Sequence, residues 1–308
     1  MAKSLKKPLK TIHQMTFKEW EQAFPDERHC MVYLTHHRWR EGVRCPRCGN
    51  PECKPHGTME FNWLCNKCSP TATNYRFSVI AGTIFENTNK PLRDWFRVIH
   101  LMLTSKKGIS ALQIHRMMGF GSYKTAWYMC HRVRAGLANE EFRKLIGYVE
   151  VDETYIGGND KNRHADKKSH KPGGQGDPLK FAVIGAVERK GNVVARVLDK
   201  VNTATMTNFI SEVVSTDVSL LSTDDAVGYR NLRDNYRHGA VDHSKKKYVV
   251  GALHTNTIEG FWSLIKRGVM GSYHKVSRKY LPLYVAEFQF RYNNRSNPNI
   301  FAEAIRGC

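Results

Sequence analysis

The chain of 308 residues carries 48 lysines and arginines against 28 aspartates and glutamates, a net charge of +20 with neutral histidines, so we expect a polyanionic partner. Its mixture of 41% hydrophobic and 25% charged residues excludes collagen-like, coiled-coil and wholly disordered chains. Since no apolar run is long enough to span a membrane and no apolar secretion signal follows the basic start, we expect a cytoplasmic protein with reduced cysteines.

The first half of the sequence predicts helices on both sides of a cysteine-rich segment. Residues 1–44 combine a basic tail with a helical segment that begins at a capping box, Thr16 followed by Glu19. Residues 45–85 contain five of the eight cysteines together with several turn residues, which indicates a small metal-binding domain. Residues 86–146 predict a third, helical region. Its three helices begin near Pro91, Ser110 and Ser122.

Near residue 147 the pattern changes from helices to strands, and we assign residues 147–308 to one α/β domain. Strands are predicted at 148–155, 179–188, 192–198 and 218–223, and helices at 205–215, 256–270 and 278–295. The segment between the first two strands is rich in glycine, lysine and histidine and predicts a long loop. This order of elements favours a mixed sheet flanked by helices.

Two Cys-x-x-Cys pairs, separated by sixteen residues, lie in the segment 45–85. Their members are Cys45, Cys48, Cys65 and Cys68. Each such pair turns two sulfurs toward one tetrahedral ion, so the spacing predicts a zinc ribbon with one structural Zn²⁺ and no catalytic role for that metal. Cys53 and His56 lie between the two pairs and are the alternative ligands.

The helices that begin near Ser110 and Ser122, with the glycine-containing turn 119–121 between them, have the layout of a helix-turn-helix. The second helix would present basic side chains to a major groove of double-stranded DNA. These are Lys124, His131, Arg132 and Arg134. The alternative is a plain helical pair that packs in a core. The net charge favours DNA, because neutralised phosphates supply most non-specific affinity.

Three carboxylates are the catalytic candidates. Asp152 lies in the strand 148–155, Asp224 follows the strand 218–223, and Glu259 lies in the helix 256–270. Because the ends of neighbouring strands meet at one edge of a sheet, we expect the two aspartates to converge, with the helix adding the third acid. Such oxygen ligands suit two Mg²⁺ ions, or Mn²⁺, which together can activate a hydroxyl and stabilise the leaving oxygen of a phosphodiester.

Helical geometry adds Lys266 to these candidates. Glu259 and Lys266 are seven residues apart, so they lie about 20° apart around the helix, at the border of its apolar stripe. There they can bind a metal and an adjacent phosphate. The alternative is a solvated pair on an amphipathic helix. Asn256 lies on the same side of the helix and is a further candidate.

Three motifs carry a resemblance to a known family. They are V-E-V-D-E-T-Y-I-G-G at 149–158, S-T-D-D-A-V-G-Y at 222–229 and H-T-N-T-I-E-G-F-W-S-L-I-K-R-G at 254–268. With the cysteine pairs and the helix after Ser122, they resemble bacterial insertion-sequence transposases of the DDE class, related to the Merlin superfamily. The resemblance implies a ribonuclease H-like catalytic domain, metal-dependent cleavage and transfer of DNA strands, and binding to terminal inverted repeats as a homodimer or larger multimer, associated with the nucleoid.

The resemblance also implies roles for single residues. Asp152 resembles the first metal-binding aspartate, Asp224 the second and Glu259 the third acid, with Lys266 as its basic companion. Asp225 and Asn256 are the alternatives for the second and third positions. The rival interpretation is a DNA-binding regulator with the same zinc ribbon and helix-turn-helix and an inactive catalytic domain.

Overall fold

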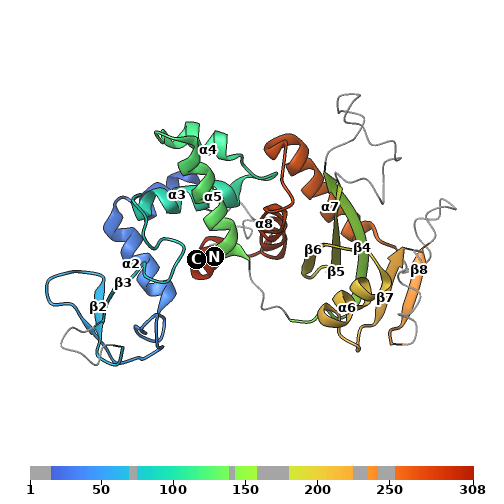
Figure 1. Cartoon of the computed structure of the whole chain (residues 1–308), viewed down its shortest axis with the longest axis horizontal. Coiled ribbons are helices and arrows are strands. Elements are labelled where there is room, and N and C mark those ends of the chain that lie inside the picture. The colour runs from blue at the N-terminus through green and yellow to red at the C-terminus, as the bar shows by residue number, and fades with distance from the viewer. Residues whose placement is uncertain (1–14, 69–74, 139–142, 158–179, 225–234, 242–253) are drawn as a thin grey trace, which may run out of the picture. The chain divides into compact units, whose positions relative to one another are not determined.

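The structure is a computed structural model of the chain that describes residues 15–68, 75–138, 143–157, 180–224, 235–241 and 254–308. It consists of two compact units, one formed by residues 1–138 with 294–308 and the other by residues 139–293 (Figure 1). Within the described ranges, no helix is both long enough and apolar enough to cross a membrane.

The first unit begins with two helices and a small antiparallel sheet of strand order β1-β2-β3. The elements are α1 (Phe17–Ala23), α2 (Glu27–Arg38), β1 (Cys53–Pro55), β2 (Asn62–Cys65) and β3 (Tyr75–Ser78). The predicted capping box starts α1, because the Thr16 hydroxyl accepts from the backbone N–H of Glu19 at 3.2 Å and the Glu19 carboxylate accepts from the backbone N–H of Thr16 at 2.7 Å. The rings of Trp39, Trp63 and Phe77 pack around the cysteines of the sheet.

Four more helices complete this unit: α3 (Leu92–Thr104), α4 (Ala111–Met118), α5 (Tyr123–Leu137) and α9 (Ile300–Gly307). The helices α4 and α5, joined by a turn with Gly119 in the left-handed conformation, have the expected helix-turn-helix layout. The sequence predicted that residues 147–308 form a single domain, but the last helix, α9, belongs to the first unit, where it packs on α2, α3 and α5. The close approach of α9 to α5 requires glycine at position 307, because a Cβ there would lie 2.6 Å from the carbonyl oxygen of Gly136.

The second unit is built on a five-stranded mixed sheet of order β6-β5-β4-β7-β8 (Figure 1). The strands are β4 (Tyr148–Gly157), β5 (Lys180–Glu188), β6 (Val193–Leu198), β7 (Leu220–Asp224) and β8 (His238–Val241). The strand β5 runs antiparallel to both β4 and β6, whereas β7 runs parallel to both β4 and β8. The prediction of a ribonuclease H-like mixed sheet is confirmed, although the sequence analysis did not predict β8.

Helices cover both faces of this sheet. The helix α6 (Thr203–Val213) packs on the face that carries Val149 and Val151. The opposite face, which includes Ile156, packs against α7 (Asn256–Gly268) and α8 (Leu281–Asn293), with a π-helical turn (Val269–Tyr273) after α7. Because side chains alternate along a strand, the polar residues at 150, 152 and 154 of β4 share the α7 face with Ile156.

The edge strand β6 is covered by amide side chains from α8. Asn293 accepts from the backbone N–H of Val193 at 2.7 Å and donates to its carbonyl at 3.0 Å, and Gln289 accepts from the N–H of Ala195 at 2.8 Å. These bonds satisfy backbone groups that a free edge would expose to other strands. They also fix α8 on the sheet beside α7.

Candidate functional site

The four cysteines predicted as zinc ligands lie together in the first unit. The Sγ atoms of Cys45 and Cys68 are 3.5 Å apart, those of Cys48 and Cys65 are 3.7 Å apart, and all four lie within 4.8 Å of one another. A tetrahedral ion with Zn–S bonds of about 2.3 Å needs sulfurs about 3.8 Å apart. The cluster therefore fits one structural zinc ion.

The surroundings of the cluster favour this set of ligands over its alternatives. Burial opposes ionisation of the Cys65 thiol, but hydrogen bonds from neighbouring backbone amides and thiols lower its pKa to about 6, as suits a metal-binding thiolate. Cys53 donates its thiol hydrogen to the carbonyl of Asn50 at 3.3 Å. The Nδ1 atom of His56 accepts from the backbone N–H of Met59 at 3.2 Å. Cys53 thus has a backbone partner beside the quartet, next to Cys65, and His56 has a backbone partner of its own.

A cleft of about 510 Å³ lies between β4 and α7 of the second unit. It is lined by Asp152, Glu153, Thr154, Glu259, Trp262, Ser263, Lys266, Arg267 and Met270. Three of the four catalytic candidates, Asp152, Glu259 and Lys266, are therefore brought to one cavity from segments about a hundred residues apart. Acidic and basic side chains share its walls, which suits a metal ion beside a phosphate.

Asp152 is oriented by a tryptophan. The indole Nε1 of Trp262 donates to Asp152 Oδ2 at 3.1 Å. The indole has room because Gly185, the residue that pairs with Asp152 across β4 and β5, has no side chain; a Cβ there would lie 2.7 Å from the ring. Burial, with the negative charges of Glu153 and Asp224 nearby, raises the pKa of the Asp152 carboxyl to about 7.

Asp224 ends β7, the parallel neighbour of β4. The last paired residues of these strands are Val151 and Thr223, so Asp152 and Asp224 are each the next residue along. Leu221 of β7 packs on the α6 face, and alternation therefore directs Asp224 to the α7 face, as it directs Asp152. The neighbouring alternative, Asp225, lies outside the described residues.

Glu259 and Lys266 lie on the exposed border of α7, whose buried stripe is the one predicted from the sequence. The hydroxyl of Thr255, the residue before the helix, donates to Glu259 Oε1 at 2.9 Å and so orients that carboxylate. Asn256 is the exposed first residue of the helix. Among the described residues the cysteine quartet alone is gathered closely enough to share one metal ion, so the oxygens of Asp152, Asp224 and Glu259 are spaced more widely than the four sulfurs.

A further carboxylate, Glu150, flanks the first predicted aspartate in the sequence, where either a supporting role beside the metal ligands or an exposed position is expected. It is fully buried, and its Oε2 accepts from the backbone N–H groups of Thr257 at 2.7 Å and Ile258 at 3.0 Å. Its Oε1 accepts from Arg189 Nε at 2.6 Å and from the Thr257 hydroxyl at 2.8 Å, with His254 Nδ1 at 3.1 Å. Glu150 therefore caps the N-terminus of α7. Its place two residues before Asp152, on the same strand face, was the signal available in the sequence.

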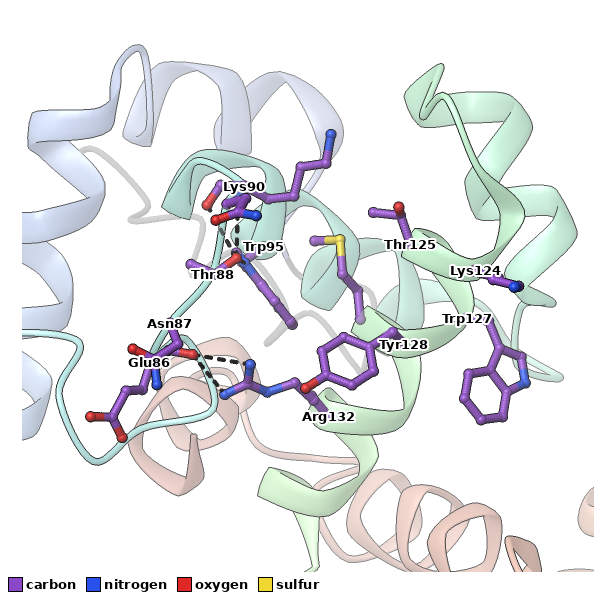
Figure 2. A pocket seen from close by; sticks show the side chains of 12 residues that line it. Glu86, Asn87, Thr88, Lys90, Trp95, Lys124, Thr125, Trp127, Tyr128 and Arg132 are labelled. Carbon is purple, nitrogen blue, oxygen red and sulfur yellow. Dashed lines mark hydrogen bonds between the residues drawn. The ribbon is translucent and has the colours of Figure 1, made fainter.

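In the first unit, a groove of about 910 Å³ separates α5 from the loop that precedes α3 (Figure 2). Its walls combine amides, hydroxyls, lysines and aromatic rings. They are formed by Glu86, Asn87, Thr88, Asn89, Lys90, Trp95, Lys124, Thr125, Trp127, Tyr128, Met129 and Arg132. Polar, basic and aromatic groups on one open surface are typical of contacts to nucleic acid.

The basic residues predicted for DNA binding take different positions around this groove. Lys124 is exposed in the first turn of α5. Figure 2 shows the guanidinium of Arg132 reaching the loop, where it donates to the carbonyl oxygen of Glu86 through both terminal nitrogens at 3.1 Å. Arg134 is only 1% exposed, and His131 is buried against Trp127. The burial of Arg134 is therefore inconsistent with the predicted direct contact to DNA, because this residue lies on the inner face of α5.

Comparison with known proteins identifies two domains. Residues 144–293 match the ISXO2-like transposase domain, and residues 25–71 match the transposase zinc-ribbon domain. An uncharacterized protein in transposable element ISH50 of Halobacterium salinarum is 28% identical over 280 residues, which cover 88% of this chain and 92% of that protein.

Two solved structures show a weaker likeness. A chain of a simian T-cell lymphotropic virus intasome in complex with PP2A regulatory subunit B56 gamma is 13% identical, with a TM-score of 0.28 over 59% of this chain and 68% of that one. A chain of a pre-cleavage Mos1 transpososome is 12% identical, with a TM-score of 0.28 over 71% and 80%. Neither is close enough to inform the function of this chain.

Proposed function

We propose that this chain, which belongs to the insertion-sequence transposases by both of its matched domains, binds the terminal inverted repeats of its element and cleaves and joins DNA strands with Mg²⁺ or Mn²⁺. It would do so as a dimer or larger multimer on nucleoid DNA. The observation that carries the catalytic part is the arrangement of carboxylates: Asp152 and Asp224 follow the last paired residues of parallel neighbouring strands, and Glu259 lines the same cleft as Asp152.

The oxygen donors of Asp152, Asp224 and Glu259 suit divalent metal ions, which when bound activate the attacking hydroxyl and stabilise the leaving oxygen of a phosphodiester. The protein itself supplies orientation. Trp262 holds the carboxylate of Asp152, and Thr255 holds that of Glu259. Because carboxylates bind metals in their ionised form, the proton that Asp152 retains up to about pH 7 has to leave when the site is loaded.

Two cations in the cleft are placed to hold the substrate. Lys266 and Arg267, both exposed in the last turns of α7, line the cleft that contains Asp152 and Glu259. A DNA phosphate that enters this cleft therefore meets positive charge from Lys266 and Arg267 and carboxylates from both walls, Asp152 on β4 and Glu259 on α7. This arrangement positions the scissile phosphate without a base-specific contact.

The DNA-binding part of the proposal centres on the exposed edge of α5. Lys124, Tyr128 and Arg132 recur at every fourth position and line the groove of Figure 2. Since Arg132 is hydrogen-bonded to the carbonyl of Glu86, we assign it to holding the loop and assign phosphate contacts to Lys124 and to Lys90 on the opposite wall. Two basic runs of the sequence, 161–171 and 245–247, are further candidates for phosphate contacts, and both lie outside the described residues.

The catalytic proposal is tested by replacing the acids one at a time and measuring Mg²⁺-dependent cleavage of the element's own ends. Asp152→Ala, Asp224→Ala and Glu259→Ala should each lower cleavage by about 10³-fold or more, because loss of a metal removes several kcal/mol of transition-state stabilisation. Binding of the ends should remain. Lys266→Ala should retain partial activity, and Asp225→Ala should stay active.

Opposite results would separate the rival interpretations. Cleavage that survives in all three acid variants would favour the DNA-binding regulator. An inactive Asp225→Ala with an active Asp224→Ala would move the second ligand by one residue. Loss of DNA binding together with loss of cleavage would show that these acids maintain the fold and do not serve chemistry.

The DNA-binding proposal is tested by the salt dependence of affinity. Lys124→Ala should weaken binding to all sequences and lower the slope of log affinity against log salt by about 0.9, as expected for one lost phosphate contact. Lys200→Ala, which removes the same charge from an exposed site of the second unit, is the matched control and should leave the slope unchanged. Equal slopes for all three proteins would remove Lys124 from the interface.

A further inference from the structure

The buried carboxylate of Glu150 joins the strand that carries Asp152 to the helix that carries Glu259. Every group within hydrogen-bond distance of it on α7 is a donor: two backbone N–H groups and one hydroxyl, from Thr257 and Ile258. Arg189 adds a charged donor and also binds the carbonyl of His254, just before the helix, at 3.1 Å. One side chain of β4 thus holds the whole N-terminal turn of α7.

The contacts require a carboxylate at this position. Its two oxygens accept four hydrogen bonds from surrounding donors, and no donor of its own is needed. A glutamine would direct its NH₂ group either at the N–H groups of Thr257 and Ile258 or at the guanidinium of Arg189, so donors would oppose donors. The negative charge also interacts favourably with the positive end of the helix dipole.

This junction sets the geometry of the proposed metal site. Glu150 and Asp152 are two residues apart on one face of β4, and Glu259 lies one residue beyond Ile258, whose N–H Glu150 binds. A shift of the helix start along the strand would therefore change the separation of Asp152 and Glu259 directly. A second tie, the bond from Trp262 to Asp152, lies farther along α7 and fixes the helix at another point.

We propose that Glu150 is a positioning residue, which clamps the start of α7 to β4 and so sets the separation of the metal-binding carboxylates Asp152 and Glu259. This inference rests on the proposed metal-dependent function. It assigns to Glu150 no contact with the metal or the DNA, because the side chain is fully buried and both its oxygens already accept hydrogen bonds from donors in the β5–β6 turn and in α7. Outer residues of this kind commonly change metal affinity by about 10- to 100-fold.

Trp262 provides a readout that does not depend on activity. It is the only tryptophan among residues 139–293, and its indole N–H binds a proposed metal ligand. The full-length chain labelled with 5-fluorotryptophan should give six ¹⁹F resonances, of which Trp262→Phe identifies one. Titration with Mg²⁺ should shift this resonance as Asp152 becomes a ligand.

The experiment compares Glu150→Gln with Glu287→Gln. Glu287 is an equally buried carboxylate of the same unit, 3.5 Å from Arg291 and 3.0 Å from the hydroxyl of Tyr273, and does not line the cleft. Both variants lose a buried charge, so both should lower the melting temperature. The Mg²⁺ concentration that half-shifts the Trp262 resonance should rise about 10- to 100-fold in Glu150→Gln and stay near the wild-type value in Glu287→Gln.

Two outcomes would overturn the inference. If Glu150→Gln binds Mg²⁺ as the wild type does, or if Glu287→Gln weakens binding equally, Glu150 has no specific positioning role, while the proposed function stands. If the wild-type resonance does not respond to Mg²⁺ and the wild type does not cleave DNA, the proposed function itself fails. If Glu150→Gln does not fold, the test uses Thr257→Val, which removes one hydroxyl donor to Glu150. Unchanged Mg²⁺ affinity in that variant would reject the proposed role of Glu150.

Discussion

The zinc ribbon and the acidic cleft collect their ligands in opposite ways. In the ribbon, two short turns each supply a pair of sulfurs, and the second pair lies only sixteen residues after the first. At the acidic site, the three acids come from two strands and a helix, with 71 residues between Asp152 and Asp224 and 34 between Asp224 and Glu259. Strand register and the clamp at the helix start determine how close these acids come.

This difference separates a structural from a catalytic arrangement. The quartet is compact and offers four thiolates, which would fill the coordination positions of a tetrahedral ion, so its metal would be closed to substrate. Two of the acids, Asp152 and Glu259, line an open cleft that also contains Lys266 and Arg267. We therefore expect the ribbon to depend on its metal for folding, and the second unit to fold without metal but to depend on it for chemistry.

The largest effect should follow removal of zinc. Cys45→Ser together with Cys65→Ser should abolish zinc binding and unfold the segment 45–78, since structural zinc contributes about 10–16 kcal/mol in small zinc domains. Metal analysis should give one zinc per wild-type chain, and hydrogen exchange should show loss of protection confined to the ribbon.

The control for this experiment is Cys53→Ser, which alters a neighbouring thiol that bonds to Asn50 and lies outside the quartet. It should retain one zinc per chain. Zinc content that survives the double substitution, or that disappears in Cys53→Ser, would contradict the assigned ligands.

An intermediate effect is expected at Gly185, where the acidic site depends on close packing. Gly185→Ala should destabilise the second unit by about 1–3 kcal/mol, because the new methyl group would overlap the indole of Trp262. It should also weaken Mg²⁺ binding by displacing the donor to Asp152. Thermal unfolding and the Trp262 ¹⁹F titration measure the two effects.

Gly260→Ala is the matched control for this change. Gly260 is exposed on α7, and a Cβ placed there would meet nothing within 4 Å beyond the backbone of its own helix. Since alanine favours helix over glycine by about 0.5–1 kcal/mol, this variant should be slightly more stable and should bind Mg²⁺ normally. If Gly185→Ala behaves like Gly260→Ala, the packing argument for the cleft is wrong.

The smallest effect is a dependence of Mg²⁺ binding on pH. In the metal-free folded protein the pKa of the Asp152 carboxyl is about 7, whereas in the unfolded chain it is about 3.9. The folded state therefore holds this proton more tightly. The resulting stabilisation is complete below about pH 4 and is lost as the pH rises through 7. Mg²⁺ binds the ionised form. Its affinity should therefore fall by up to about tenfold per pH unit below 7.

Titrations of the Trp262 resonance at pH 6 and pH 8 measure this dependence, and equal affinities at the two pH values would contradict it. Unfolding of metal-free Asp152→Asn gives an independent control. Because asparagine does not titrate, the variant should gain stability relative to the wild type as the pH rises from 4 to 8.

Much of the chemistry was predictable from the sequence because it depends on short-range patterns. The Cys-x-x-Cys spacing predicted the quartet, the Thr16 and Glu19 pair predicted the start of α1, and the apolar stripe of the helix at 256–270 predicted its buried face. Each of these features is determined within one or two turns of chain. The family resemblance added roles for the acids that spacing alone would not have shown.

Long-range contacts decided the remainder. Helical spacing presented Arg132 and Arg134 as DNA contacts, but packing buries Arg134 and gives Arg132 the carbonyl of Glu86 as its partner. Two helix starts are capped by carboxylates from distant elements: Glu27 accepts from the backbone N–H of Leu92 at 2.6 Å, and Glu150 accepts from that of Ile258 at 3.0 Å. Local capping rules cannot reveal such partners.

The sequence by itself thus determined the zinc ligands, the helix faces and the acidic candidates, because these follow from residue type and from spacing along the chain. Only the tertiary structure decided that Asp152 and Asp224 occupy equivalent places on parallel strands, that Gly185 makes room for Trp262, and that Glu150 fastens α7 to β4. The physical reason is that strand register, burial and hydrogen-bond partners between distant segments are set by the packing of the whole unit, which no local pattern encodes.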